Sequence, residues 1–192
     1  METSEERYSR ALADLTENYT AFHNAGAAAY CPGLEKTLTL SARLGNPHCK
    51  YRTIHVGGTN GKGSTAHTIA AVLQSAGLKT GLYTSPHILD FRERIRVNGK
   101  MICKDFVSEF MTKLGTIKGE FQPSYFEAVT LMAFDYFAAD QIRVYDFFYV
   151  GQMHHTIQSV FGVDFYERTL GAEAKTARLV DGYFVGQTFF CD

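Results

Sequence analysis

A glycine-dense segment, Gly57 to Thr65, constrains this chain more than any other feature. It follows Tyr51 to Val56, whose β-branched and apolar residues predict a short buried strand. It leads into Ser64 to Ala76, which predicts a helix. Glycines let backbone N–H groups approach a bound anion closely, and a helix adds its positive N-terminal end. The segment therefore predicts a phosphate-binding loop; the alternative is a glycine-rich turn that binds nothing.

The predicted helix at 64–76 has recognisable ends. Ser64 or Thr65 can cap its start, and Gly77 lies where a C-terminal cap belongs. Its apolar positions are Ile69, Val72, Leu73 and Ala76. Lys79 to Tyr83 predicts a second strand. Because a strand–helix–strand unit joins parallel strands, we expect an α/β fold in which helices flank a parallel sheet.

The glycine segment also carries groups suited to ATP. Lys62 offers a mobile positive charge for the β- and γ-phosphates, and we expect it to be catalytic. Ser64 or Thr65 offers a hydroxyl near Mg²⁺. The general pattern of such loops is G-x-x-x-x-G-K-[ST]. Here the two flanking glycines are one residue closer together, and Gly63 separates the lysine from the hydroxyl.

Further elements are predicted on either side of this unit. We expect helices at 5–22, 35–44, 105–114 and 124–139, the last of them well buried because apolar residues lie nearly all round it. Asn98-Gly99, between Arg94–Val97 and Lys100–Ile102, is the strongest short signal for a β-hairpin turn. Arg143 to Val150 predicts another strand.

Composition argues against several classes of protein. Of 192 residues, 45% are hydrophobic and 20% charged, and the formal net charge of −1 gives no basic surplus for nucleic acid. No apolar run approaches the roughly 18 residues of a membrane span, and the polar N-terminus does not resemble a signal peptide. Because the four cysteines are far apart, at Cys31, Cys49, Cys103 and Cys191, we expect reduced thiols and a cytoplasmic protein. We also expect a monomer.

Several segments resemble, in order, the signatures of the folylpolyglutamate synthase and dihydrofolate synthase family, which belongs with the Mur ligases. Gly58 to Thr65 is similar to the family's ATP loop. Tyr83 to His87, extended by Phe91 to Gly99, resembles a second signature, and Ser124 to Glu127 a third. Upstream, Gly26 to Leu34 resembles the family's substrate-side loop.

This resemblance implies an ATP-dependent amide-bond ligase. A carboxylate of folate or dihydropteroate attacks the γ-phosphate of MgATP, and the amine of L-glutamate then attacks the acyl phosphate. The residues that would hold ATP are Thr59, Asn60, Gly61, Lys62, Gly63, Ser64 and Thr65. Ser85 and Ser64 would bind Mg²⁺. The pterin side would be lined by Cys31, Pro32, Gly33, Leu34, Ser124, Tyr125, Phe126 and Glu127.

Simpler interpretations stand beside these assignments. Ser85 can be a turn hydroxyl, and His87 a hydrogen-bonded loop histidine. The Cys31–Leu34 segment can be a plain turn. Tyr125 to Glu127 can supply two core aromatics and a negative charge that the helix dipole favours.

Residues 141–192 differ in character, with 11 aromatic residues and no strand–helix rhythm after the strand. We therefore expect an incomplete Mur-ligase-like ATP-binding domain at 1–140 and a divergent tail at 141–192. Tyr149-Val150-Gly151 stands where the family has Glu-Val-Gly, so its metal-binding glutamate is missing. The family's later histidine ligand, its carboxylated lysine motif and its C-terminal domain have no counterpart.

The tail leaves several alternatives open. It could come from a frameshift or truncation, form a divergent cap that closes the sheet, or be a separate short module. Asp146 could offer Mg²⁺ a substitute carboxylate. His154 and His155 are not expected to share a metal, because adjacent residues of a strand point to opposite faces.

Three functions follow from these features: an active ligase, a nucleotide-binding fragment with little or no turnover, and a different phosphate-loop enzyme such as a small-molecule kinase. The Thr84–His87 run and the substrate-side loop argue against the third. The missing carboxylate and glutamate site favour the second for the isolated chain.

Overall fold

The computed structural model describes residues 2–19, 35–56 and 61–140, and the backbone of strands beyond them. Among these residues the helices are α1 (Ser4–Asn18), α3 (Glu35–Arg43), α4 (Lys62–Ser75), α5 (Lys104–Ile117) and α6 (Tyr125–Ala139), with 3-10 turns η2 (Pro47–Cys49) and η3 (Phe91–Arg94). The strands are β1 (Arg52–Val56), β2 (Thr80–Tyr83), β3 (Ile95–Val97), β4 (Lys100–Met101), β5 (Val144–Phe148), β6 (Arg178–Val180) and β7 (Tyr183–Val185).

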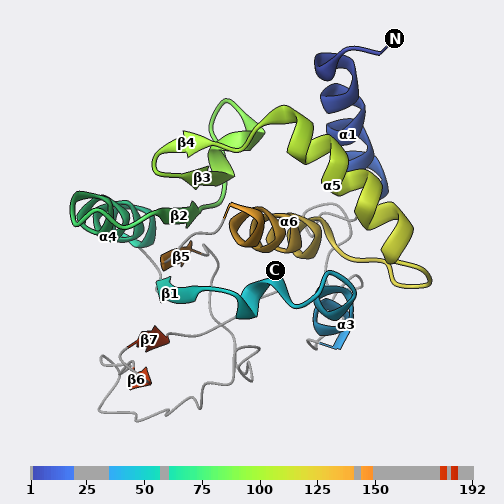
Figure 1. Ribbon diagram of the computed structural model, residues 1–192. Helices are drawn as coiled ribbons and strands as arrows, with labels where there is room; N and C mark the ends of the chain where they lie inside the picture. The colour runs from blue at the N-terminus through green and yellow to red at the C-terminus, as the bar shows by residue number, and fades with distance from the viewer. Residues whose placement is uncertain are drawn as a thin grey trace.

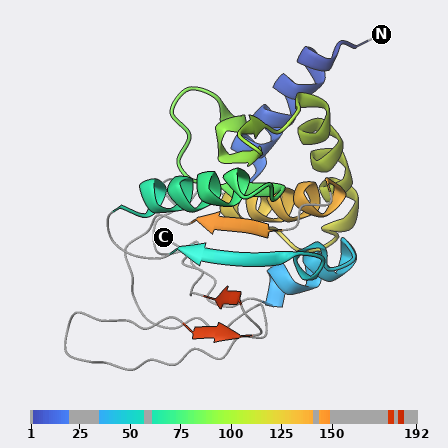
Figure 2. The ribbon, with the colours of Figure 1, turned by 60° about the vertical axis from the view of Figure 1, so that its left-hand side comes forward.

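The predicted α/β class is confirmed, and β5 is the middle strand of its parallel part. Within the described chain the sheet order is β1-β5-β2-β3-β4, and β5 pairs in parallel with both β1 and β2. Figure 2 shows β1 and β5 side by side and running in the same direction. The strands β1, β5 and β2 therefore end at one edge, after Val56, Phe148 and Tyr83, which we call the carboxyl edge. β6 and β7 form a separate antiparallel pair.

The predicted hairpin is also present, and it extends the sheet from β2. β3 pairs antiparallel with β2 and with β4, so this part of the sheet is not parallel. Asn98 and Gly99 have φ values of 47° and 76°, the left-handed conformation that a tight hairpin turn requires. The Asn98 side chain accepts a hydrogen bond from the Thr80 backbone N–H at 2.9 Å, which fixes the hairpin turn to the start of β2.

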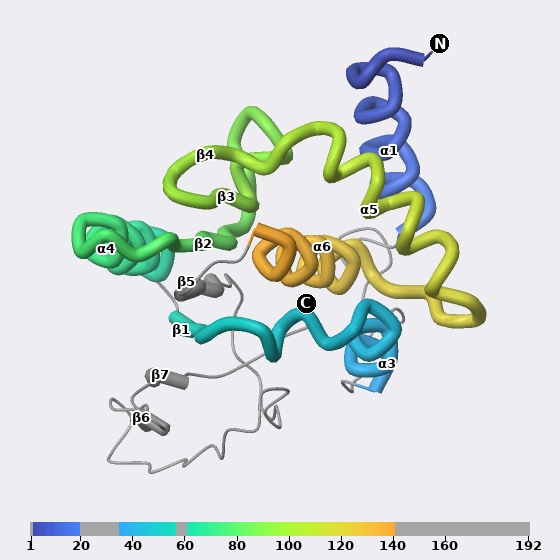
Figure 3. Tube along the Cα trace, in the orientation of Figure 1, coloured from blue at the N-terminus to red at the C-terminus, as the bar shows by residue number. Residues whose placement is uncertain are grey.

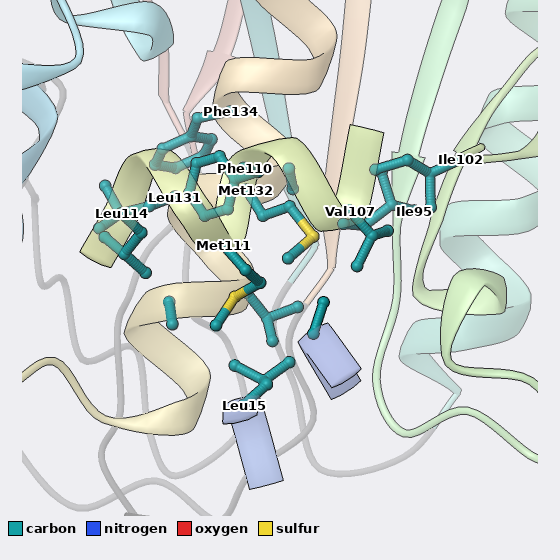
Figure 4. Packing of buried hydrophobic residues seen from close by; sticks show 14 of the residues in the cluster. Leu15, Ile95, Ile102, Val107, Phe110, Met111, Leu114, Leu131, Met132 and Phe134 are labelled. Carbon is teal, nitrogen blue, oxygen red and sulfur yellow. The ribbon is translucent and has the colours of Figure 1, made fainter. Parts of the chain in front are cut away.

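The core is built around α6, which is buried on nearly every side as predicted. In Figure 1 the helix lies at the centre, between the strands on one side and α5 on the other. Its buried residues are Ala128, Val129, Thr130, Leu131, Met132, Ala133, Phe134 and Phe137. Figure 4 shows this helix packing through Leu131 and Met132 towards Met111 of α5 and Leu15 of α1. Burial of this apolar surface is the main stabilising contribution to the fold.

The predicted ends of two helices, α1 and α5, were wrong. α1 ends at Asn18, not at residue 22, because Tyr19 adopts an extended conformation with φ −116° and ψ 114°. α5 runs from Lys104 to Ile117, beyond the predicted 105–114, because Leu114 and Ile117 continue its buried stripe. Figure 3 shows α1 beside α5, an arrangement that an ion pair between Arg7 and Asp105 supports at 2.9 Å.

α4 begins earlier than predicted. Its first residue is Lys62 and its N-cap is Gly61, so neither Ser64 nor Thr65 caps the helix. Gly61 has a φ of 79°, a left-handed conformation that glycine adopts without steric cost. The C-terminal prediction is confirmed, because Gly77 follows the last turn with a φ of 77°.

The buried face of α4 also differs from its predicted apolar face. It consists of Lys62, Ala66 and Ala70, whereas the side chain of Val72 is 63% exposed and Ala76 is also exposed. α4 lies on the other side of the strands from α6 (Figure 1), and it contacts β1, β5 and β2. Small alanine side chains face Leu82 and Val56 there and let the helix approach the sheet.

Three further expectations can be compared with the structure. β1 is only partly buried, with His55 as its buried residue, because it is an outer strand in the order of the described sheet. Cys49 and Cys103 are free thiols. In the part of the chain that is described, no helix is both long and apolar enough to cross a membrane.

The packing predicts a large difference between two aliphatic positions. Leu131 is fully buried in α6, so Leu131→Ala should lower the free energy of unfolding by about 2–5 kcal/mol. Val72→Ala, on the outer face of α4, should change it by less than about 0.5 kcal/mol. Urea unfolding of both variants measures the difference. Equal losses would show that a partner covers the outer face of α4 and that this packing is incomplete.

Candidate functional site

The N-terminus of α4 lies at the carboxyl edge, because α4 is the next element of the chain after β1. Gly61 and Lys62 begin the helix, so the first turn presents backbone N–H groups that have no partner within the helix. Such groups, together with the helix dipole, favour an anionic ligand. The predicted ATP residues Gly61, Lys62, Gly63, Ser64 and Thr65 all fall in this first turn or its cap, whereas Thr59 and Asn60 lie outside the described residues.

Lys62 is buried at the start of α4, with 4% of its surface exposed. Burial lowers the pKa of its ammonium group, because the charged form loses hydration. A bound phosphate would compensate for this loss, since an opposite charge favours the ammonium form. The position of Lys62 is thus suited to an anionic ligand, and Lys62 is the one cation among the predicted ATP residues.

The two predicted hydroxyls are not equivalent. Thr65 Oγ1 donates a hydrogen bond to the Gly61 carbonyl at 3.0 Å, one helical turn back. Ser64 is exposed, and its hydroxyl forms no hydrogen bond with any described residue. Ser64 can therefore use both its proton and its lone pairs towards a ligand, whereas Thr65 keeps only its lone pairs for one.

A second part of the carboxyl edge follows β2. Ser85 and His87 lie in the loop after Tyr83, and Arg94 at the end of η3 contacts both. Arg94 Nη1 donates to Ser85 Oγ at 2.6 Å, and Arg94 Nε donates to His87 Nδ1 at 2.8 Å. Burial, and to a smaller extent the Arg94 charge, lower the pKa of His87. The hydrogen-bonded interpretation of His87 is confirmed, and the Ser85 hydroxyl accepts a hydrogen bond from the same arginine.

The rest of this loop is held by two carboxylates. The Glu93 side chain accepts hydrogen bonds from the backbone N–H groups of Ile88, Leu89 and Asp90, at 2.9, 3.1 and 2.9 Å. Asp90 pairs with Arg92 at 2.6 Å, and this hydrogen bond is the main reason that the pKa of Asp90 falls to about 2. These contacts fix the path of the chain from β2 to β3 and so place Arg94.

The third predicted motif meets the second through Arg94. The Arg94 guanidinium lies over the ring of Tyr125, with its carbon 5.4 Å from the ring centre. Phe126, the next residue of α6, packs on Tyr83 of β2, with ring centres 6.2 Å apart. The sequence singled out Tyr125 and Phe126 but missed the role of Arg94, although it lies within the Phe91–Gly99 signature.

Glu127 has a structural role, as one of its two sequence interpretations proposed. Its carboxylate accepts from the Ser124 N–H at 2.7 Å and from the Ser124 hydroxyl at 2.8 Å. Its other oxygen accepts from Thr37 Oγ1 of α3 at 2.9 Å, and Lys36 Nζ lies 3.8 Å from the oxygen that Ser124 contacts. The carboxylate thus caps α6 and ties it to α3, which leaves it little capacity to bind a pterin.

Several predicted site residues cannot be placed in this geometry. Cys31, Pro32, Gly33 and Leu34 lie outside the described residues, as do Tyr149 to Gly151 and the His154-His155 pair. Asp146 lies in β5 opposite Ile54 and Leu82, but only its backbone is described. Within the described ranges, no group of three histidine, cysteine or acidic residues could hold a metal ion.

Known proteins with the same sequence features are folate-linked ligases. A folylpolyglutamate synthase from Lacticaseibacillus casei is 38% identical over 138 residues, which cover 68% of this chain and 32% of that protein. The crystal structure of folylpolyglutamate synthase from Thermotoga maritima superposes with a TM-score of 0.67 and 39% identity, over 75% of this chain and 33% of that one. The chain is homologous to folylpolyglutamate and dihydrofolate synthases.

Two further findings bear on this homology. A bifunctional folylpolyglutamate synthase/dihydrofolate synthase from Yersinia pestis, complexed with AMPPNP and a manganese ion, superposes with a TM-score of 0.64 and 28% identity, over 76% of this chain and 34% of that one. No protein-family model matches the chain. The chain spans about a third of the length of these relatives.

The contacts of Glu127 predict that its removal affects stability. Glu127→Ala should lower the free energy of unfolding by about 1–2 kcal/mol, because it loses the α6 cap and the bond to Thr37. Glu109→Ala, at an exposed position of α5, should change it by less than about 0.5 kcal/mol. Chemical denaturation tests both variants. If Glu127→Ala is as stable as the unmodified protein, the carboxylate is free to serve a ligand instead.

Proposed function

We propose that the chain binds MgATP at the carboxyl edge, with its phosphates at the N-terminus of α4. The observation that carries this proposal is the burial of Lys62 in the first turn of α4. This helix follows the parallel strand β1 in the chain, and Gly61 is its N-cap. The ATP-binding set would be Thr59, Asn60, Gly61, Lys62, Gly63, Ser64 and Thr65. The homologous protein from Yersinia pestis is complexed with AMPPNP and a manganese ion, which supports a nucleotide and a divalent metal as ligands.

The reaction that this site would serve is ATP-dependent ligation of L-glutamate to folate or dihydropteroate. Lys62 would neutralise charge that develops as the γ-phosphoryl group moves to the substrate carboxylate. The resulting acyl phosphate would then react with the amine of glutamate. Mg²⁺ would neutralise phosphate charge when bound, with Ser64 and Ser85 as the hydroxyls placed to hold it. Ser64 is exposed, whereas Ser85 is half-buried and its hydroxyl oxygen already accepts a hydrogen bond from Arg94.

The acceptor side of the site would lie towards α6. Tyr125 is partly buried and in contact with Arg94, and Phe126, also partly buried, packs on the fully buried ring of Tyr83. Cys31 to Leu34 and Ser124 complete the proposed pterin-side set. Glu127 would act on this side only by holding the start of α6, because its carboxylate already accepts hydrogen bonds from Ser124 and Thr37.

A second candidate function is ATP binding with little or no ligation. Its basis is the sequence at the end of β5, where Tyr149-Val150-Gly151 replaces the Glu-Val-Gly of the family and supplies no carboxylate to the metal.

Release of ADP distinguishes these candidates. With MgATP and dihydropteroate or folate present, an active ligase should release ADP only when L-glutamate is added. Lys62→Met should reduce this release by at least about 100-fold, the scale on which loss of one charge-stabilising group acts. Lys100→Met, which removes an exposed lysine on β4, is the charge-matched control.

The other results separate the alternatives. ATP binding without ADP release, with or without glutamate, supports the second candidate. A phosphorylated product that accumulates in the absence of glutamate would instead identify a kinase and contradict both.

A further inference from the structure

Arg94 joins two motifs of the carboxyl edge, the loop after β2 and the start of α6, although it is not itself on the surface. Its side chain is 8% exposed, yet it contacts Ser85 and His87 after β2 and the ring of Tyr125 at the start of α6. Ser85 and His87 are both half-buried, so each keeps part of its surface accessible to solvent. Arg94 can therefore act on a bound ligand through its hydrogen bonds to these two side chains.

The direction of these hydrogen bonds determines where the proton of His87 lies. A guanidinium can only donate hydrogen bonds, so His87 Nδ1, 2.8 Å from Arg94 Nε, must accept one and carry no proton. A neutral imidazole with an unprotonated Nδ1 has its proton on Nε2. No described residue accepts a hydrogen bond from this Nε2–H group. The same reasoning applies to Ser85 Oγ, which accepts from Arg94 and so directs its own proton away from it.

We propose that Arg94 is a positioning residue that holds His87 in the Nε2–H tautomer, so that His87 donates a hydrogen bond to an anionic oxygen bound beside Ser85. The chemical class of the ligand is an oxyanion, either a phosphate oxygen of the nucleotide or a carboxylate oxygen of the acceptor. This assignment of the ligand rests on the proposed function, whereas the tautomer follows from the contacts alone.

The charges around Arg94 are consistent with an anion. Among the described residues, no carboxylate forms an ion pair with its guanidinium. The two nearby carboxylates are committed elsewhere, Asp90 to Arg92 and Glu93 to three backbone N–H groups. A positive charge without an acidic partner raises the local potential, which favours an oxyanion at the adjacent donors.

Arginine is the residue type that this position requires. Its planar fork reaches two acceptors at once and stacks on an aromatic ring, whereas a lysine offers a single point charge. Arg94→Lys should therefore retain the charge but lose the simultaneous hold on Ser85 and His87. Arg94→Gln removes the charge as well. Arg96→Gln, on β3, is the matched control, because Arg96 donates to the Glu93 carbonyl and contacts neither Ser85 nor His87.

Nitrogen-15 NMR of the histidine side chains tests the tautomer directly, without any ligand. In the unmodified protein His87 should show an unprotonated Nδ1 and a protonated Nε2. Arg94→Gln and Arg94→Lys should give a mixture of tautomers, and Arg96→Gln should not. If His87 carries its proton on Nδ1, or if the Arg94 variants leave its tautomer unchanged, the positioning role is contradicted.

Titration with MgATP, inorganic phosphate and folate in turn tests the donor role and distinguishes the sources of the oxyanion. The Nε2 resonance of His87 should shift with the phosphate probes or with the folate carboxylate. His87→Gln, which can place an N–H near the Nε2 position, should retain affinity for the probe that causes the shift, and His87→Ala should weaken it about 10-fold or more.

The outcomes separate this inference from the proposed function. If the His87 Nε2 resonance shifts with inorganic phosphate but not with MgATP, the donor role is supported and ATP is not the ligand. A fixed Nε2–H tautomer that responds to none of the three probes contradicts the donor role, and Arg94 then serves only to hold the loop.

Discussion

Burial of α6 is the constraint on which the rest of this structure depends. The helix is apolar on nearly every side, so it must be covered by the strands, by α3 and by α5 together with α1. Its first turn then has a fixed place, because the capping pair of Ser124 and Glu127 also reaches Thr37 of α3. Tyr125 and Phe126 follow directly, and this puts their rings against Arg94 and Tyr83. The core thereby positions one side of the candidate site.

The sheet positions the other side. Insertion of β5 between β1 and β2 places the ends of three parallel strands at one edge, the place where α/β proteins generally bind ligands. The start of α4 and the loop of Ser85 follow two of those strands. Two sources of positive charge result, the buried Lys62 with the helix N-terminus and the buried Arg94 behind Ser85 and His87. Both favour an anionic ligand, as a site for a nucleotide and a carboxylate substrate requires.

Local patterns in the sequence predicted where helices and turns occur more accurately than they predicted how these elements pack. The hairpin at Asn98-Gly99 and the helix at 124–139 were predictable from local residue types. Asn and Gly favour the backbone conformation of a tight turn, and apolar residues on all sides of a helix require burial. The face of α4 was not, since Ala66 and Ala70 pack on the sheet while Val72 faces outward. The start of that helix was missed because Gly61 replaced a side-chain cap. Arg94 was missed for a different reason, since its role depends on contacts with Ser85, His87 and Tyr125 that only the fold brings together.

Thermal unfolding of the chain with and without MgATP tests the central claim, that the start of α4 is a phosphate site in this protein. A ligand at 100 times its dissociation constant should add about 2.7 kcal/mol, which raises the melting temperature by roughly 5–10 °C for a chain of this size. The rise should disappear in Lys62→Met and persist in Lys100→Met. A cooperative transition that MgATP leaves unchanged, or a rise that Lys62→Met retains, would contradict the claim.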